Sequence, residues 1–439
     1  MRRALALLVF LTGWLVLGAT PASAHVQIVS TTPLDGTRLG AAPTLVTLTL
    51  SENIGIQPNS IQVVDVAGER VDTGPVFQPG EVAEQVAVRL KPGLPHDSYL
   101  VEYAFVSADS HPVRGTFAFV VGDGPLVTSA GAVSASTGTD PGVDALFTVF
   151  RWASFLGVVL LGGLVFVLTC RPAGRTDPRV ARLLRWGCGI TAVTAVAGFL
   201  LQGPYVAGLG VAALADPAMI SVTFGVAYGK LLLLRLVAAF ALASLIPRVL
   251  VPGLPERLRS RYENLTLVAG FVVLLSFAAT GHAVSDPIMY FSITADLAHF
   301  GAIAIWIGGL VQLALVLRRP ADGEEVAAVV ARFSRTAFVS VAVIVASGAY
   351  LAFRNVPSVE ALFTTTYGVL LLLKLVGFSV LLMLANLSRQ AVLRGIAGRS
   401  GGVVVAELNR LRLAVGAEVV LATVVLGLAA MLSSISPTG

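Results

Sequence analysis

Eight long apolar segments dominate this 439-residue chain, in which 56% of the residues are hydrophobic and only 13% are charged. Each segment is long enough to cross the ~30 Å hydrocarbon core of a membrane. Because lipid offers no water to the backbone, a spanning segment must satisfy its own hydrogen bonds, which favours helices. The sequence therefore predicts an all-α polytopic bundle with spans at about residues 145–169, 184–207, 222–246, 264–281, 291–317, 333–353, 366–387 and 411–433.

Arginine residues indicate which ends of these spans face the cytoplasm, because basic loops are retained there. Basic clusters follow the first, third, fifth and seventh spans, at Arg171 to Arg185, Arg248 to Arg261, Arg318 to Arg335 and Arg389 to Arg412. We therefore expect a multi-pass protein of the cytoplasmic membrane whose N-terminal part and C-terminus lie outside. The net charge of +5 is modest and lies in these short clusters, which argues against nucleic acid as a partner.

The first 24 residues have the features of a cleaved signal peptide. Arg2 and Arg3 precede an apolar stretch from Ala4 to Leu17, and Ala22-Ser23-Ala24 is a small-residue ending of the kind that signal peptidase cuts. Cleavage at this point makes His25 the first residue of the mature protein.

Residues 25–121 predict a small exported β domain. The stretch is rich in Val and Thr, and alternating runs such as Leu45 to Leu50 and Tyr99 to Val106 are separated by turn signals. A Greek-key sandwich or barrel of about seven strands, similar to an immunoglobulin domain, fits this pattern. Residues 122–143 contain few bulky side chains and predict a flexible linker. The membrane domain then covers residues 144–435.

The membrane domain contains an internal repeat. The run from Tyr228 to Val237 recurs as the run from Tyr367 to Val376, and the Gly-Gly-Leu sequence at Gly162 recurs at Gly308. Spans one to four therefore resemble spans five to eight. Four crossings return the chain to the side of the membrane on which it started, so the two halves have the same orientation. Such a design places a shared site between the two halves.

A copper(II) site is predicted in the exported domain. After cleavage, His25 offers both its free α-amino group and its ring Nδ1 to one metal ion. Asp109 and His111 stand at positions i and i+2, so they lie on the same face of an extended chain. This tetragonal set of N and O ligands suits copper(II), and the domain contains no methionine for copper(I). Glu52 is a candidate to hydrogen-bond the ligands.

Five further side chains outline a copper pathway in the membrane domain. Asp296 and His299 are three residues apart on the fifth span and share one helical face, about one to two turns inside the outer boundary. His282, Asp286 and Met289 lie just before them and would complete a funnel for copper. Ionisable groups in a span are costly and usually functional. A structural Asp–His hydrogen bond between helices is the alternative.

Other polar or reactive residues in the spans have simpler interpretations. Lys230, Arg235, Lys374 and Glu418 either pair with one another across the repeats or serve packing. Cys170 and Cys188, the two cysteines of the chain, are expected to be ordinary small residues at the cytoplasmic ends of spans one and two.

The exported domain resembles the CopC family of copper-binding proteins. The stretches that carry this resemblance are Thr32 to Gly36, Thr47 to Glu52 and Val106 to Phe117. The resemblance implies that the three predicted ligands bind copper(II). Ser110 stands where the family commonly has glycine, and the family's methionine-rich copper(I) site is missing here.

The membrane domain resembles CopD. The residues that carry this resemblance are Asp296 to His299, Trp306 to Leu310 and Tyr367 to Lys374. Fused CopC–CopD proteins are associated with copper uptake or copper tolerance, and the resemblance implies that role here without giving the direction of transport.

The expected function is therefore copper handling and not catalysis. The β domain would capture copper(II) outside, the linker would let it dock, and the bundle would pass copper on for import, homeostasis or tolerance. No hydrolytic or nucleotide-binding motif indicates an enzyme. Copper chaperones or other copper-handling proteins are candidate partners. Two alternatives stay open: an electron-transfer protein in which His282 and His299 hold a haem or a copper, and a copper buffer or sensor without transport.

Overall fold

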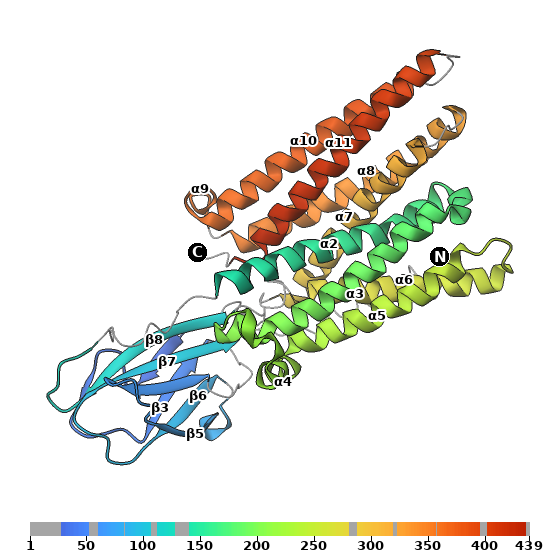
Figure 1. Cartoon of the computed structure of the whole chain (residues 1–439). Helices are drawn as coiled ribbons and strands as arrows, with labels where there is room; N and C mark the ends of the chain where they lie inside the picture. Colours follow the sequence, from blue (N-terminus) through green and yellow to red (C-terminus); the bar gives the residue numbers. More distant parts are fainter. Residues whose placement is uncertain are drawn as a thin grey trace.

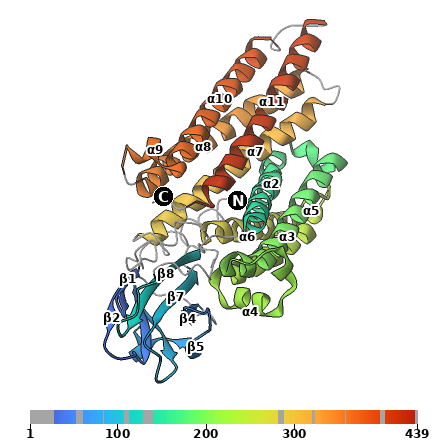
Figure 2. The same ribbon diagram turned by 60° about the vertical axis from the view of Figure 1, so that its left-hand side comes forward.

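The computed structural model has a β domain at one end of a bundle of long helices (Figure 1). A view turned by 60° shows the β domain below the ends of the helices and not along their sides (Figure 2). The structure describes residues 28–51, 60–82, 84–106, 112–127, 140–280, 288–318, 323–356, 358–395 and 402–435.

The β domain is a sandwich of two four-stranded sheets, which confirms the predicted fold class. One sheet has the strand order β1-β3-β6-β5 and the other β2-β8-β7-β4. Strand β2 runs parallel to β8, and the other described pairs are antiparallel. The strands are β1 (Ile28–Thr32), β2 (Arg38–Leu39), β3 (Leu45–Leu50), β4 (Ile61–Asp65), β5 (Asp72–Phe77), β6 (Gln85–Leu90), β7 (Ser98–Val106) and β8 (Pro112–Val121), with a short turn η1 (Pro79–Glu81).

Alternation along the strands builds the core of the sandwich, because successive side chains point to opposite faces. In β3, Val46 and Leu48 are fully buried, whereas the threonines beside them are half-buried. Val101 on β7 and Phe119 on β8 are fully buried from the facing sheet. The described domain has eight strands where about seven were expected, and one of the eight is the two-residue β2.

Eight described helices are long and apolar enough to cross a membrane, which confirms the predicted number of spans. They are α2 (Pro141–Thr169), α3 (Pro178–Ala207), α5 (Ala227–Leu250), α6 (Glu256–Ala278), α7 (Met289–Leu317), α8 (Gly323–Asn355), α10 (Thr366–Gly395) and α11 (Gly402–Leu432). Short elements lie between them, namely η2 (Pro172–Thr176), η3 (Val211–Ala215), α4 (Pro217–Gly225) and α9 (Ala361–Thr364).

Three helices begin at the same Asp-Pro signal. Asp140, Asp177 and Asp216 each accept a hydrogen bond from a backbone N–H group in the first turn of α2, α3 or α4, and a proline follows directly. The carboxylate satisfies an N–H group that has no partner within the helix. Proline fits the first helical position because its φ is already helical and its missing N–H is not needed there.

The helices alternate in direction, so their ends form two opposite faces. Helices α2, α5, α7 and α10 run away from the β domain, and α3, α6, α8 and α11 return toward it (Figure 1). The connections with the basic clusters therefore lie at the far face. Two ion pairs join elements there, Arg171 to Glu325 at 3.0 Å and Arg175 to Glu263 at 2.7 Å.

Helix boundaries differ from the predicted spans for two reasons. Helix α5 begins at Ala227 and not at 222, because α4 is a separate helix that ends at Gly225. Helix α6 begins at Glu256 and not at 264, and α8 begins at Gly323 and not at 333. Both helices extend past their apolar part into polar residues. Hydropathy therefore marks the part of a helix that suits lipid and not its ends.

Two equivalent glycines show that the sequence repeat is also a structural repeat. Helix α4 precedes α5 in the first half, and α9 precedes α10 in the second. A Cβ on Gly229 would overlap the carbonyl oxygen of Thr223, and a Cβ on Gly368 would overlap that of Ala361. Each half therefore needs a glycine at the same place, where the short helix crosses the start of the long one.

Helices α2 and α7 cross with their backbones in contact. A Cβ on Gly162 would overlap the carbonyl oxygen of Ala304, and a Cβ on Gly308 would overlap that of Val159. Small residues allow two membrane helices to approach this closely. Because Gly162 and Gly308 are equivalent in the repeat, the two halves meet at this crossing.

Candidate functional site

The predicted site residues divide into two groups. His25, Glu52, Asp109, His111, His282 and Asp286 lie outside the described residues, so their roles stay predictions. Met289, Asp296 and His299 are described and lie on α7, where Met289 is the first residue.

Arg114 on β8 attaches the β domain to the bundle. Its Nη2 donates to the carbonyl oxygens of Tyr205 at 2.5 Å and Val206 at 2.6 Å, at the C-terminal end of α3. Gly208 follows in the left-handed conformation with φ 70°, and a Cβ there would lie 3.0 Å from Nη1 of Arg114. The last carbonyls of a helix lack partners within the helix and carry partial negative charge, so they attract a guanidinium group.

Glu102 lies on the same face of the β7–β8 pair as Arg114. The register places Glu102 opposite Thr116 and Ala104 opposite Arg114, and α3 contacts β7. One carboxylate oxygen of Glu102 is buried and has no hydrogen-bond partner among the described residues. Burial raises the pKa of this carboxyl group. Burial thus makes Glu102 easier to protonate than a solvent-exposed glutamate.

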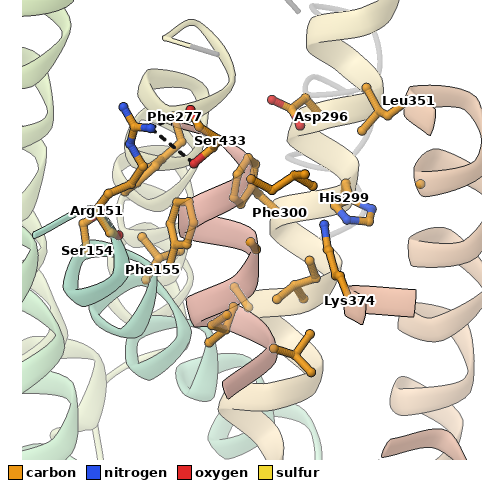
Figure 3. Close-up of a pocket in the computed structure, with 18 of the residues that line it drawn as sticks. Arg151, Ser154, Phe155, Phe277, Asp296, His299, Phe300, Leu351, Lys374 and Ser433 are labelled. Carbon is orange, nitrogen blue, oxygen red and sulfur yellow. Dashed lines mark hydrogen bonds between the residues drawn. The ribbon is translucent and has the colours of Figure 1, made fainter. Parts of the chain in front are cut away.

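A cavity of about 500 Å³ lies inside the bundle. Helices α2, α3, α5 and α6 line it from the first repeat, and α7, α8, α10 and α11 line it from the second. Figure 3 shows Arg151 of α2 on one side and His299 of α7 with Lys374 of α10 on the other. Asp296 also lines the cavity, whereas Met289 does not. The cavity lies between the halves, where the repeat predicts a shared site.

His299 is positioned by Ser347 on α8. The Ser347 hydroxyl donates to the carbonyl oxygen of Val343 at 2.6 Å and lies 3.0 Å from Nδ1 of His299. Since the only hydroxyl proton is used by that carbonyl, the serine oxygen accepts a hydrogen bond from Nδ1–H. Neutral His299 then keeps the lone pair on Nε2, which is a form that can bind a metal.

Asp296 and Lys374 lie near His299 at the edge of the cavity. Lys374 interacts electrostatically with both of the other side chains, and its ammonium group points toward the His299 ring in Figure 3. In the described ranges, no ion pair joins Asp296 to Lys374. Nor is the alternative Asp–His hydrogen bond formed there, because the interhelical partner of His299 is Ser347. A carboxylate, an imidazole and an ammonium group therefore line one side of the cavity.

No three His, Cys, Asp or Glu side chains come close enough to hold a metal ion within the part of the chain that the structure describes. Of the three described residues of the predicted pathway, Asp296 and His299 line the cavity as possible ligands and Met289 does not. Cys170 and Cys188 are both free and buried, as expected for ordinary small residues.

The other charged residues of the spans have different surroundings. Arg235 and Lys374 are equivalent in the repeat, and both line the cavity. Glu418 is buried and accepts a hydrogen bond from Ser388 at 2.6 Å, and Lys230 is exposed. Among the described residues, the first of the two alternatives for these charges, ion pairing across the repeats, is not formed.

Three family profiles match separate parts of the chain. The CopC domain matches residues 28–122. The N-terminal domain of copper resistance protein D-like proteins matches residues 142–287, which correspond to the first helical repeat. Copper resistance protein D matches residues 327–432, within the second repeat. The matched regions follow the division into a β domain and two helical halves.

Relatives of known name match the same parts. Copper transport protein CutJ of Bacillus subtilis (strain 168) is 32% identical over 363 residues, which are 80% of this chain and 65% of CutJ. Copper resistance protein D of Pseudomonas syringae pv. tomato is 34% identical over 200 residues, which are 41% of this chain and 62% of that protein. This chain therefore spans a little under two thirds of both relatives.

The β domain is covered more completely. Copper resistance protein C of Pseudomonas syringae pv. tomato is 32% identical over 117 residues, which are 26% of this chain and 90% of that protein. The names of these relatives refer to copper transport and copper resistance and not to catalysis. The chain thus belongs to the CopC/CopD copper-resistance family, as a fusion of a CopC domain with a CopD membrane domain.

Proposed function

We propose that this protein captures copper(II) outside the cytoplasmic membrane and delivers it to its membrane domain, for copper import and homeostasis or for copper tolerance. Family membership supports copper as the ion that is handled. The basic face of the bundle would then lie in the cytoplasm, with the β domain and the C-terminus outside. The observation that carries the delivery step is the attachment of Arg114 to α3, because it holds the copper-binding domain against the membrane domain.

The proposed capture site consists of His25, Asp109 and His111, with Glu52 as a hydrogen-bonding neighbour of the ligands. The amine and ring of His25 supply two nitrogen ligands after signal-peptide cleavage. One extra residue before His25 in the mature protein converts this amine to an amide, so we expect strongly weakened copper(II) binding with an unchanged fold. Calorimetric titration and circular dichroism measure the two properties. An unchanged copper(II) affinity would refute the N-terminal chelate.

Chain connectivity supports a short transfer distance. His111 precedes Arg114 by three residues. Three residues of fully extended chain reach about 10 Å. Copper held by Asp109 and His111 would therefore stay close to the contact between the β domain and α3, and release would occur at this end of the bundle.

The proposed receiving groups in the membrane domain are Asp296 and His299, with His282, Asp286 and Met289 before them as the entrance. The Nε2 lone pair of His299 and the carboxylate of Asp296 suit copper(II). Transport requires binding that is favourable enough for entry and weak enough for release. A site with two described ligands beside a positive charge fits this requirement.

Radiocopper uptake into vesicles of known orientation tests the transport step. His299→Ala should reduce the initial rate severalfold, because it removes one of two described ligands. His96→Ala is the matched control, since His96 is an exposed histidine in the turn before β7. Unchanged uptake in His299→Ala would contradict a transport role for this site and would favour a copper buffer or sensor.

An absorbance spectrum of the purified protein separates copper delivery from electron transfer. A haem held by His282 and His299 would give a Soret band, whereas the proposed function requires none. Nδ1 of His299 is engaged by Ser347 and Nε2 remains for a ligand, which suits copper and haem iron equally, so the spectrum decides between the two functions.

A further inference from the structure

The central cavity combines an aromatic wall with an excess of positive charge. Its lining includes Phe147, Phe155, Phe277, Phe300, Trp306 and Phe378, and most of the remaining wall is aliphatic. A volume of about 500 Å³ falls within the range of pockets that enclose small organic molecules. The cavity therefore has the size and the walls of a ligand site.

The charged residues of the lining do not balance. Arg151, Arg235 and Lys374 are basic, and Asp296 is the one acidic residue among the described residues that line the cavity. One carboxylate can neutralise one of these three cations. Uncompensated charge inside a membrane bundle is costly, and such residues usually face a ligand, a pathway or a partner of opposite charge.

Arg235 illustrates the imbalance in the first repeat. It is 5% exposed, and its Nε and Nη2 donate to the hydroxyl and carbonyl oxygens of Ser276, each at 2.9 Å. Its guanidinium carbon lies 3.5 Å from the centroid of the Phe277 ring. These partners are neutral, so they satisfy hydrogen bonds and leave the positive charge uncompensated.

Arg151 adds a second cation on the same side of the cavity. Its Nη1 donates to the carbonyl oxygen of Ser433 at 2.5 Å and to the Ser434 hydroxyl at 2.9 Å. Its guanidinium also lies 5.0 Å from the Phe147 ring centroid, and its charge acts on Arg235. Two like charges thus face one space, and their hydrogen-bond and ring partners in the described part of the chain are neutral.

We propose that the central cavity binds an amphipathic anion, with its acidic head between Arg151 and Arg235 and its apolar body against the aromatic wall. The head would be a carboxylate or a phosphate, which guanidinium groups bind through charge-assisted hydrogen bonds. This binding goes beyond copper delivery and does not require copper. A neutral lipid would fill the same volume but would leave both arginines uncompensated.

Quenching of Trp306 by a brominated long-chain fatty acid provides the test. The full chain would carry phenylalanine at Trp14, Trp152 and Trp186, so that Trp306 in the cavity wall is the remaining tryptophan. We expect saturable quenching by the acid and at least tenfold weaker quenching by its methyl ester, which has the same body and no charge. Equal quenching by both compounds would overturn the proposal. This comparison uses one protein, so it does not depend on how a charge variant folds.

Charge variants locate the head group. Arg235→Gln and Arg151→Gln should each weaken binding of the acid about tenfold or more, whereas Arg248→Gln, at an exposed position near the end of α5, should not. Unchanged affinity in both cavity variants would place the head elsewhere and overturn the assignment. Equilibrium binding of the radiolabelled fatty acid repeats the comparison without fluorescence.

Mass spectrometry of the molecule extracted from the purified full chain identifies the chemical class of the bound ligand. A fatty acid or an anionic phospholipid would support the proposal and distinguish the carboxylate from the phosphate head. Recovery of neutral lipid alone would overturn it. Fatty-acid binding is measured in the absence of copper, so failure of copper delivery and failure of this proposal give different results.

Discussion

Arg114 of the β domain donates a hydrogen bond through Nη2 to the carbonyl oxygen of Val206, the penultimate residue of α3, at 2.6 Å. The two residues come from different domains and are 92 positions apart in the sequence. A helix end that lacks partners for its own carbonyls thereby becomes the attachment point of the copper-binding domain.

Loss of this attachment should separate copper binding from copper delivery. Hydrogen bonds to charged groups contribute about 1.5–3 kcal/mol each, so Arg114→Ala should release the β domain from α3. We expect the pulsed-EPR distance distribution between spin labels on β5 and α4 to broaden. The copper(II) affinity of the protein should stay unchanged, and copper uptake should fall. Arg89→Ala removes an exposed arginine from the other sheet and serves as the control. Normal uptake in undocked Arg114→Ala would contradict delivery through this contact.

Glu102 should make the attachment depend on pH. Burial raises the pKa of the Glu102 carboxyl group in the docked state. The Glu102 side chain therefore stabilises docking fully at pH values below the pKa that it has in the undocked domain. The contribution is lost as the pH rises through the docked pKa, so the docked population should fall from acidic toward neutral pH. Glu102→Gln should flatten this dependence and increase docking at neutral pH.

The same EPR distances, recorded between pH 4 and pH 8, measure the effect of Glu102. Glu69→Gln, at an exposed position outside this interface, is the control. An identical pH profile for Glu102→Gln and the wild type would show that another group controls docking.

Lys374 should weaken cation binding at Asp296 and His299. Two unit charges 4 Å apart repel each other by about 4 kcal/mol at an effective dielectric constant of 20. Relief of about 1.4 kcal/mol is enough for a tenfold gain in affinity. Lys374→Gln should therefore retain copper about tenfold more tightly in the membrane domain and slow its release, as measured by stopped-flow release to a chelator. Lys230→Gln, an exposed position on α5, should behave as wild type.

Gly229 and Gly368 should be equally intolerant of a side chain. A methyl group at either position would overlap a backbone carbonyl oxygen, which cannot move aside as a side chain would. Overpacking of this kind costs about 1–3 kcal/mol. Gly229→Ala and Gly368→Ala should each lower the Tm of the detergent-solubilised protein, whereas Gly270→Ala, with no neighbour within 4 Å, should not. A lower Tm for only one of the pair would contradict the structural equivalence of the repeats.

Local patterns in the sequence were sufficient for much of the fold. The alternation of Val46 and Leu48 with threonine predicted β3 to the residue, because a period of two follows from strand geometry alone. The equivalent runs at Tyr228 and Tyr367 predicted the repeat. The break before Ala227 was missed, because the apolar sequence continues through it and the contact of Gly229 with Thr223 depends on tertiary structure.

The candidate site was predictable in part. Asp296 and His299 stand out as ionisable residues within an apolar span. Ser347, which sets the tautomer of His299, is a single serine on another helix and belongs to no motif. Arg114 lies in a family motif that gives no indication of its role in docking. Both depend on contacts between residues far apart in the sequence, which local patterns do not encode.

The glycine crossing of α2 and α7 lies well away from the middle of α2. From Gly162, α2 extends about 30 Å toward the β domain and about 10 Å toward the basic face, at 1.5 Å per residue. A rotation of the two halves about this point therefore moves the long arms roughly three times as far as the short arms. The cavity lies beside the long arms, and the ion pair between Arg171 and Glu325 lies beyond the short ones. Such a rotation would widen the bundle at the end beside the β domain, with little displacement at the opposite end.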